Sequence, residues 1–352
     1  MKICFLEGDM SRRGGTERIT AMLANALCED NDVFIYSLRL EDKVVYYSLD
    51  NRVHHEVLKN KDNKAKIHNH IRQIHSIVKE KHIDWIINVD VGMGFYGILA
   101  AKGTSARVIT WEHANFYNNW NSRIFPYLRR FAAKHSDVMV VLTEMDKRNY
   151  EINIRNHAPV YVIPNPAVTH DFNYDINSKI ILSAGLLLPI KGYDKAIEVA
   201  KNVLPECPEW KWIICGDGSE RNHLQKLIED ADLSEQMLLL GNIENMDEQY
   251  QKAAMFVMTS EMEGLPMVLL EAKSWGLPLL SFDIMTGPSD IIADGANGYL
   301  VPAGDIKSMS DKITLMIEDK GLRKSFSAKS QKDMDKFLFD TIIEKWKELL
   351  KQ

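Results

Sequence analysis

The sequence predicts an α/β protein with two domains, each built on a parallel sheet. Short β-branched or aromatic runs alternate with segments of helical periodicity, and this alternation is typical of parallel strands joined by crossover helices. The alternation occurs in two successive series, and the chain of 352 residues is long enough for two cores of about 150 to 200 residues each.

The two series and a terminal segment define the expected elements. The first series of strands covers residues 2–7, 32–38, 84–90, 106–112 and 137–143. The second covers 179–185, 209–218, 236–242, 253–260 and 277–283, with helices at 192–204 and 220–231. The last segment carries apolar side chains on one helical face, which is typical of a docking helix. We therefore expect domains at 1–165 and 166–335, and a helix at 336–352 that returns to the first domain.

Composition excludes several classes of protein. No apolar run approaches the roughly 18 residues that a membrane helix needs, so we expect a cytoplasmic protein. The cysteines are scattered without the spacing of metal ligands, so we expect neither a disulfide framework nor a metal site. Residues 1–165 carry 23 Lys and Arg against 19 Asp and Glu, whereas the remainder carries 20 against 30. The first domain is therefore the one expected to meet an anionic partner.

Ligands of parallel sheets bind where the carboxyl ends of the strands lead into helices. Gly14 and Gly15 follow the first strand, where glycine lets the backbone approach an anion and the next helix offers unpaired N–H groups. The alternative is an ordinary flexible loop. The segment "CGDGSER" at Gly216 imitates a dinucleotide fingerprint, but Arg221 stands where the third glycine is needed. We therefore expect no nicotinamide site there.

Two further side chains follow predicted strands. His113, in "WEHANF", lies at a sheet edge where ligands bind, although a lone histidine is also common as a structural group. Lys191 precedes a helix beside Gly192, where its charge opposes the helix dipole. An anionic ligand would explain this lysine, and a solvated surface lysine is the alternative.

The segment "SEMEGLPMVLLEAK" places two carboxylates around a turn and a helix start. Glu263 lies in the loop. Pro266 suits the first turn of a helix that runs to about Trp275, and Glu271 lies on that helix. The rise from Pro266 to Glu271 is roughly 7.5 Å, comparable to a pyrophosphate linker. The pair could therefore hold two ends of a nucleotide sugar. Alternatively, Glu263 compensates the helix dipole and Glu271 is an exposed helical residue.

In this order, the loops resemble those of the retaining glycosyltransferase family 4, which has the two-domain GT-B fold. The resemblance rests on "GGTER" near the start, "EH" at 112–113, "IPNP" at 163–166, a glycine six residues before "KG" at 185–192, "GDG" at 216–218, the glutamate pair, and "DGANGYLVPAGD" at 294–305. It implies two Rossmann-like α/β/α domains that face a central cleft. The first would bind the acceptor and the second a nucleotide-sugar donor.

The resemblance also assigns roles to the candidate residues. Lys191, with the backbone at Gly14 and Gly15, would hold the donor diphosphate, and His113 would face the donor hexose. Glu263 would bind sugar hydroxyls and Glu271 the ribose. The remaining donor-binding positions are Gly185, Asn165, Gly216, Gly264, Leu265 and Pro266, while His113, Glu263 and Lys191 form the catalytic set. The family usually has an arginine where this chain has Leu186. Lys191 would then carry more of the pyrophosphate charge, or another cation such as Arg12, Arg13 or Arg18 would substitute.

The implied function is the transfer of a hexose from a UDP-sugar to a saccharide or lipid-linked acceptor, with retention at the anomeric carbon. The hexose would be galactose, glucose or an N-acetylhexosamine, used in the synthesis of lipopolysaccharide, capsule or another cell-surface glycan. No metal or other cofactor is expected, and nucleic acid is not an expected partner. The alternatives are a non-hydrolysing sugar-nucleotide epimerase and a non-catalytic nucleotide-sugar binding protein.

A basic segment in the first domain suggests where an acceptor or membrane would be met. Residues 123–134, "RIFPYLRRFAAK", interleave aromatic side chains with Arg123, Arg129 and Arg130. This pattern resembles an interfacial segment at the anionic inner face of a membrane. A core-packing helix with a solvated basic face is the equal alternative.

Overall fold

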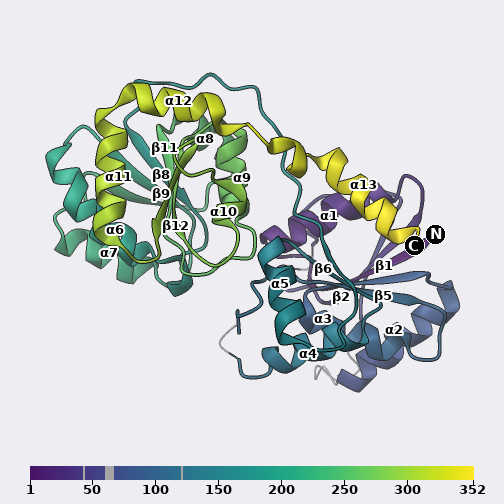
Figure 1. Ribbon diagram of the computed structural model, residues 1–352. Coiled ribbons are helices and arrows are strands. Elements are labelled where there is room, and N and C mark those ends of the chain that lie inside the picture. Colours follow the sequence, from purple (N-terminus) through teal and green to yellow (C-terminus); the bar gives the residue numbers. More distant parts are fainter. Residues whose placement is uncertain (43, 60–66, 120–121) are drawn as a thin grey trace. The chain divides into compact units, whose positions relative to one another are not determined.

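The computed structural model describes residues 1–42, 44–59, 67–119 and 122–352. The chain divides into two compact units (Figure 1). Unit 1 consists of Met1–Pro166 and Phe339–Gln352, and unit 2 consists of Ala167–Leu338. Each unit contains one parallel sheet with helices on both faces, which confirms the predicted fold class.

The described part of unit 1 holds a seven-stranded parallel sheet with the order β3-β2-β1-β4-β5-β6-β7. Its strands are β1 (Lys2–Asp9), β2 (Asp32–Arg39), β3 (Val53–Val57), β4 (Trp85–Val89), β5 (Arg107–Trp111), β6 (Val138–Val141) and β7 (Val160–Val162). The strand order reverses between β1 and β4. The carboxyl ends of these two strands therefore flank the switch point, where open parallel sheets bind ligands.

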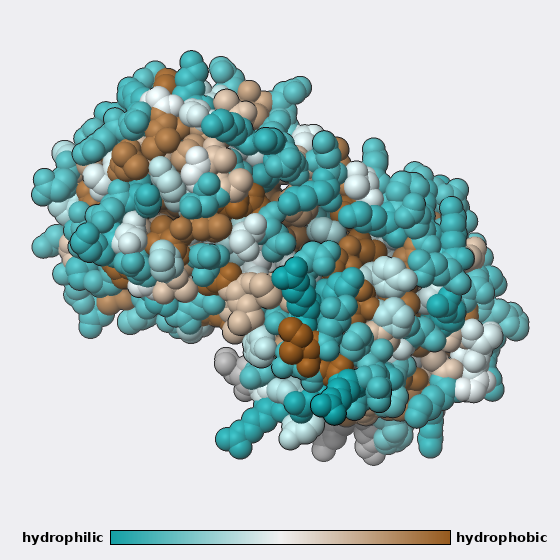
Figure 2. Space-filling model, in the orientation of Figure 1, coloured by the Kyte–Doolittle hydropathy of each residue, from teal (hydrophilic) through white to brown (hydrophobic). Residues whose placement is uncertain are grey.

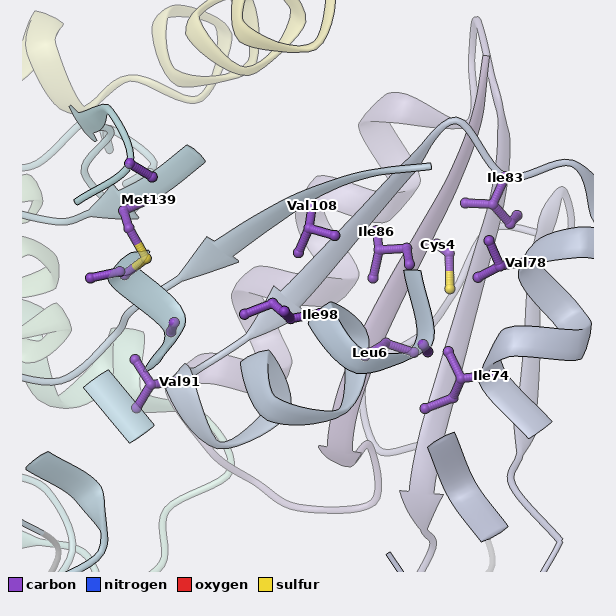
Figure 3. Packing of buried hydrophobic residues seen from close by; sticks show 14 of the residues in the cluster. Cys4, Leu6, Ile74, Val78, Ile83, Ile86, Val91, Ile98, Val108 and Met139 are labelled. Atoms are coloured by element: carbon purple, nitrogen blue, oxygen red, sulfur yellow. The ribbon is translucent and has the colours of Figure 1, made fainter. Parts of the chain in front are cut away.

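The helices of unit 1 cover both faces of this sheet. They are α1 (Gly15–Leu27), α2 (Ile67–Lys81), α3 (Val91–Ala101), α4 (Phe125–His135), α5 (Glu144–Asn153) and α13 (Phe339–Leu350). Figure 3 shows one face, where Cys4, Leu6 and Ile86 of the strands pack against Ile74 of α2 and Ile98 of α3. Each such side chain contributes about 1.5–3 kcal/mol when it is fully buried. The continuous apolar strands arise because a parallel sheet is buried on both faces.

Helix α13 packs on unit 1, as the predicted fold class requires. Its apolar stripe is buried, and the Trp346 ring meets Trp111 of β5 edge to face, with ring centroids 4.9 Å apart. The Trp85 indole N–H donates to the backbone oxygen of Leu350 at 3.0 Å. The C-terminal residues therefore form part of the core behind β4 and β5.

Unit 2 contains, in the described residues, a six-stranded parallel sheet with the order β10-β9-β8-β11-β12-β13. Its strands are β8 (Ile180–Ala184), β9 (Lys211–Cys215), β10 (Met237–Gly241), β11 (Met255–Met258), β12 (Leu279–Asp283) and β13 (Gly298–Pro302). The order reverses between β8 and β11, which pair through Ile181 and Met255. The switch point of this sheet therefore lies at the carboxyl ends of β8 and β11.

Helices also lie on both sides of the sheet of unit 2 (Figure 1). They are α6 (Tyr193–Val203), α7 (Arg221–Asp230), α8 (Met246–Lys252), α9 (Met267–Ser274), α10 (Pro288–Ile291), α11 (Ile306–Glu318) and α12 (Lys320–Ser330). Helices α6, α7 and α11 pack together, whereas α8, α9 and α10 lie on the opposite side of the strands. The predicted helices at 192–204 and 220–231 correspond to α6 and α7.

Three strands were absent from the sequence prediction: β3, β7 and β13. Strand β3 reads "VHHEV" and is mostly exposed, β7 has three residues, and β13 ends on a proline. Each is an edge strand of its sheet. Edge strands are short and carry polar residues or proline, so their composition resembles that of loops.

The described helices include none that is long and apolar enough to cross a membrane. Hydrophilic residues cover most of the face visible in the space-filling view, with scattered hydrophobic groups between them (Figure 2).

Candidate active site

Gly192 brings two loops of unit 2 together at the switch point. Gly192 ends a short 3-10 turn, η1 (Pro189–Lys191), with φ 62°, a left-handed conformation that favours glycine. A Cβ atom at Gly192 would collide with the carbonyl oxygen of Thr259, which follows β11. The absence of a side chain therefore allows the loop after β8 to contact the loop after β11.

This contact places Lys191 against Glu263. The Lys191 ammonium donates to Glu263 Oε1 at 2.6 Å, and the two side chains are 23% and 12% exposed. The backbone oxygen of Glu263 accepts from the Thr286 hydroxyl at 2.5 Å. Lys191 is therefore not a freely solvated lysine, and the sequence did not predict this ion pair.

The Gly264–Pro266 turn is fixed by close packing. Pro266 is the N-cap of α9 and not, as predicted, a residue of its first turn, and the helix ends at Ser274. A Cβ atom at Gly287 would collide with the Pro266 ring, and Leu265 is 6% exposed. The first N–H groups of α9, which begins at Met267, lack intrahelical partners, as at any helix start, and they lie four residues after Glu263 in the chain.

Glu271 is not an exposed helical residue. It is half-buried, and its Oε2 accepts from the Tyr250 hydroxyl of α8 at 2.8 Å. The two glutamates of the motif thus contact different groups: Glu263 bonds to Lys191, and Glu271 bonds to Tyr250.

The predicted glycines after β8 and β9 pack against each other. The Gly185 N–H donates to the backbone oxygen of Cys215 at 2.9 Å, and a Cβ atom at Gly216 would collide with the Gly185 carbonyl. Leu186 follows with 56% of its surface exposed, so an apolar side chain occupies the position where the resembled family has a cation.

In unit 1, Gly14 is the N-cap of α1, but the start of this helix is covered. A Cβ atom at Gly14 would collide with the carboxylate of Glu17, which lies in the first turn and is 7% exposed. Burial raises the pKa of Glu17. The predicted anion position beside Gly14 and Gly15 is thus next to a carboxylate, which sequence reasoning missed although "GGTER" contains it.

His113 is the second residue after β5, with its ring centroid 4.2 Å from that of Trp111. Burial lowers the pKa of His113 to about 3, which keeps the imidazole neutral. Its Nε2 is buried and has no hydrogen-bond partner among the described residues. Asn165 is also in unit 1, is 4% exposed, and has an Oδ1 atom without a partner in that same part of the chain.

The three predicted arginines separate into two kinds. Arg123 and Arg130 are exposed, whereas Arg129 is 1% exposed and its Nε donates to Glu112 Oε2 at 3.0 Å. The interpretation of Arg129 as a membrane-contacting cation is therefore wrong. The helical periodicity of α4 turns this position toward the core, where Glu112 compensates its charge.

Comparisons with known proteins show which family the chain belongs to. A family model of glycosyl transferases group 1 matches residues 169–333, and a model of glycosyltransferase family 4 matches residues 13–170. Amylovoran biosynthesis glycosyltransferase AmsD of Erwinia amylovora is 29% identical over 99% of both chains. An N-acetyl-D-galactosaminyltransferase of Campylobacter jejuni, named for a saccharide on diNAcBac-PP-undecaprenol, is 27% identical over 99% of this chain and 98% of its own.

A solved structure has the same fold as the whole chain. S. aureus TarM, crystallised with UDP and alpha-GlcNAc-glycerol among its ligands, matches with a TM-score of 0.85 over 100% of both chains, at 18% identity. The two family models together span nearly the whole chain, which therefore belongs to glycosyltransferase family 4 and is a glycosyltransferase with the GT-B fold.

Proposed function

We propose that this glycosyltransferase moves a hexose from a UDP-sugar to a saccharide or lipid-linked acceptor, with retention at the anomeric carbon, during synthesis of a cell-surface polysaccharide. The observation that carries the proposal is the Lys191–Glu263 pair at the switch point of the unit 2 sheet. A cation and a carboxylate side by side suit the two chemical parts of the donor. The cation would meet the diphosphate, and the carboxylate would accept from sugar hydroxyls.

The relatives support the donor and acceptor classes. TarM was solved with UDP, and the AmsD name places that enzyme in amylovoran biosynthesis. The C. jejuni relative is named for a lipid-linked saccharide. The hexose that we propose for the donor is galactose, glucose or an N-acetylhexosamine.

The proposed roles use groups that the structure has placed in each unit. In unit 2, Lys191 stabilises the departing diphosphate, Glu263 orients the hexose and Glu271 binds the ribose. In unit 1, neutral His113 accepts from or donates to the hexose. The acceptor hydroxyl attacks the anomeric carbon on the side from which the diphosphate departs. The C–O bond to the diphosphate breaks as the bond to the acceptor forms, and a phosphate oxygen takes the acceptor proton.

A donor screen tests the proposal directly. UDP release is measured with each UDP-hexose in the presence and absence of an undecaprenyl-diphosphate-linked saccharide, and the lipid product is analysed by mass spectrometry. We expect UDP release that depends on acceptor and a product heavier by one sugar. Interconversion of UDP-sugars without acceptor would indicate the epimerase instead, and UDP binding without transfer would indicate a non-catalytic binding protein.

We further propose that no metal takes part. Among the residues that the structure describes, no group of three His, Cys, Asp or Glu side chains is placed to hold a metal ion. Lys191 would supply the charge that a metal supplies elsewhere. Activity in excess chelator should equal that in added Mg²⁺, and loss of transfer in the chelator would contradict the proposal.

Peripheral contact of α4 with an anionic membrane is the last part of the proposal. Arg123 and Arg130 are exposed, as are Ile124 at 57% and Tyr127 at 67%, and basic and apolar groups together favour an anionic interface. Arg123→Glu with Arg130→Glu should abolish flotation with anionic vesicles but leave binding to neutral vesicles unchanged. The double variant Lys211→Glu with Lys226→Glu in unit 2 is the matched control. Equal flotation of both double variants would contradict the proposed membrane contact.

A further inference from the structure

The residue before His113 lies in a buried polar network. Glu112 is 1% exposed and follows β5 directly. Its Oε2 accepts from Arg129 Nε at 3.0 Å and from the Tyr150 hydroxyl at 2.9 Å. Its Oε1 accepts from the backbone N–H of Ala114 at 3.2 Å. One carboxylate thus joins α4, α5 and the loop that carries His113.

Burying the charged groups of this network in the core costs desolvation free energy. Arg129 Nη1 and Nη2 are buried without hydrogen-bond partners among the described residues. Burial, followed by the nearby charge of Asp90, raises the pKa of Glu112 to about 8. Buried ion pairs of this kind are often no better for stability than apolar residues of similar volume. The network therefore calls for an explanation other than stability.

The hydrogen bonds of the network surround His113 on both sides in the sequence. The Glu112 N–H donates to the backbone oxygen of Val140 at 2.9 Å, and the Ala114 N–H is held by the Glu112 carboxylate. Farther along, the Phe116 N–H donates to Asp146 Oδ1 of α5 at 3.0 Å. The ring of His113 is placed between these fixed points and lies against Trp111. Rotation of the loop would have to break at least one buried hydrogen bond.

We propose that Glu112, Arg129 and Tyr150 are positioning residues that hold the His113 imidazole in the orientation it uses during glycosyl transfer. The role of His113 itself rests on the proposed function. The three residues act through His113. Their network holds the loop from several sides, because the donors to Glu112 come from α4, from α5 and from the loop itself. Misplacement of a reacting group by about 1 Å can cost on the order of a hundredfold in rate.

The test compares two tyrosine variants. Tyr150→Phe removes one hydrogen bond to Glu112 and keeps the ring. Tyr174→Phe is the matched control, because the Tyr174 hydroxyl donates to the backbone oxygen of Ala254 in unit 2 at 2.7 Å. Each variant loses the hydrogen bond that its hydroxyl donates, and we expect both to lower the melting temperature. Tyr150→Phe alone should lower kcat, by about tenfold to a hundredfold, with KM for the UDP-sugar unchanged.

A spectroscopic readout separates this inference from the proposed function. The imidazole signals of His113, assigned by comparison with His113→Gln, are followed in protein with 15N-labelled histidine. We expect them to shift in Tyr150→Phe and remain unchanged in Tyr174→Phe. If the signals shift but wild-type protein transfers no sugar, the proposed function fails while the positioning of His113 stands.

The opposite result would overturn the inference. Unchanged His113 signals and unchanged kcat, with a lowered melting temperature, would make the network purely structural. Should Tyr150→Phe fail to fold, Glu112→Gln serves instead, since it keeps the side-chain shape and weakens the charge-assisted bond to Arg129. The same signals and the same kcat then decide the question.

Discussion

The candidate residues lie at the carboxyl ends of the strands in both sheets, but the two units bury the charged side chains there to different extents. In unit 1, Glu7 and Glu112 are buried, and burial raises the pKa of each to about 8. In unit 2, the Lys191–Glu263 pair remains partly exposed. A buried charge is costly to rearrange, whereas a pair near solvent can exchange one partner for a ligand at small cost. The edge of unit 1 is therefore suited to fixing geometry, and that of unit 2 to recognising an anion.

The largest effect that this comparison predicts is on stability, in unit 1. Arg129→Met leaves the Glu112 carboxylate buried without its cation and should lower the free energy of unfolding by about 3–5 kcal/mol. Arg130→Met removes an exposed cation and should change it by less than about 0.5 kcal/mol. Urea denaturation measures both values. Equal values for the two variants would contradict the distinction between the sheet edges.

The next effect is on catalysis, in unit 2. Lys191→Ala should lower kcat/KM by about a hundredfold, equivalent to about 3 kcal/mol, because the leaving diphosphate loses its cation. Lys195→Ala is a close control, since Lys195 lies in the first turn of α6, shortly after Lys191, and pairs with Glu261 in the loop after β11. Steady-state kinetics of UDP release should show near wild-type values for the control. Wild-type turnover in Lys191→Ala would remove this residue from the site.

A smaller effect separates backbone strain from close contact at the unit 2 edge. Gly192→Ala places a Cβ atom against the Thr259 carbonyl at φ 62°, whereas Gly295→Ala at φ 69° meets nothing within 4 Å. Strain alone costs about 1 kcal/mol, so Gly295→Ala gives the reference value in thermal unfolding. Gly192→Ala should exceed it and also weaken UDP binding. If the two variants behave alike, the contact between the loops does not shape the site.

The smallest effect is a pH dependence in unit 1. Because the pKa of Glu7 is raised, the folded state binds its proton more tightly than the unfolded state. The stabilising contribution of Glu7 is therefore fully present below about pH 4.5 and is lost as the pH rises through about 8. Glu7→Gln, which stays neutral, should gain stability over wild type by on the order of 1 kcal/mol at pH 9.

The control for this pH dependence is Glu235→Gln, at an exposed position. The stability of each variant relative to wild type is measured by denaturation at pH 5, 7 and 9. A constant difference for Glu7→Gln across that range would show that the carboxyl does not change its protonation on unfolding.

Most of the fold could be predicted, because long apolar runs between helical segments are a local signal. Apart from β10, which is an edge strand, the strands that were predicted lie inside the sheets, where both faces are buried. Edge strands such as β3 and β7 were missed because they lack that signal. The order of strands, which creates the switch points beside β1 and β8, depends on pairing between distant segments.

The positions of the candidate site residues at the ends of strands could be predicted, but the contacts between these residues could not. Glu263, Lys191 and His113 follow strands that are readable in the sequence, and parallel pairing brings the carboxyl ends of those strands to one edge within each sheet. The Lys191–Glu263 bond depends on Gly192 approaching Thr259. No local pattern contains that approach.

By itself, the sequence determined the class of fold, the family and the residue types available at the strand ends, because these follow from local periodicity and short motifs. Only the tertiary structure decided which of those residues are buried and what they contact. Arg129 and Arg130 are adjacent in the sequence, yet one is enclosed with Glu112 and the other is in solvent. Burial sets the cost of a charge, and it results from packing against elements far away in the chain.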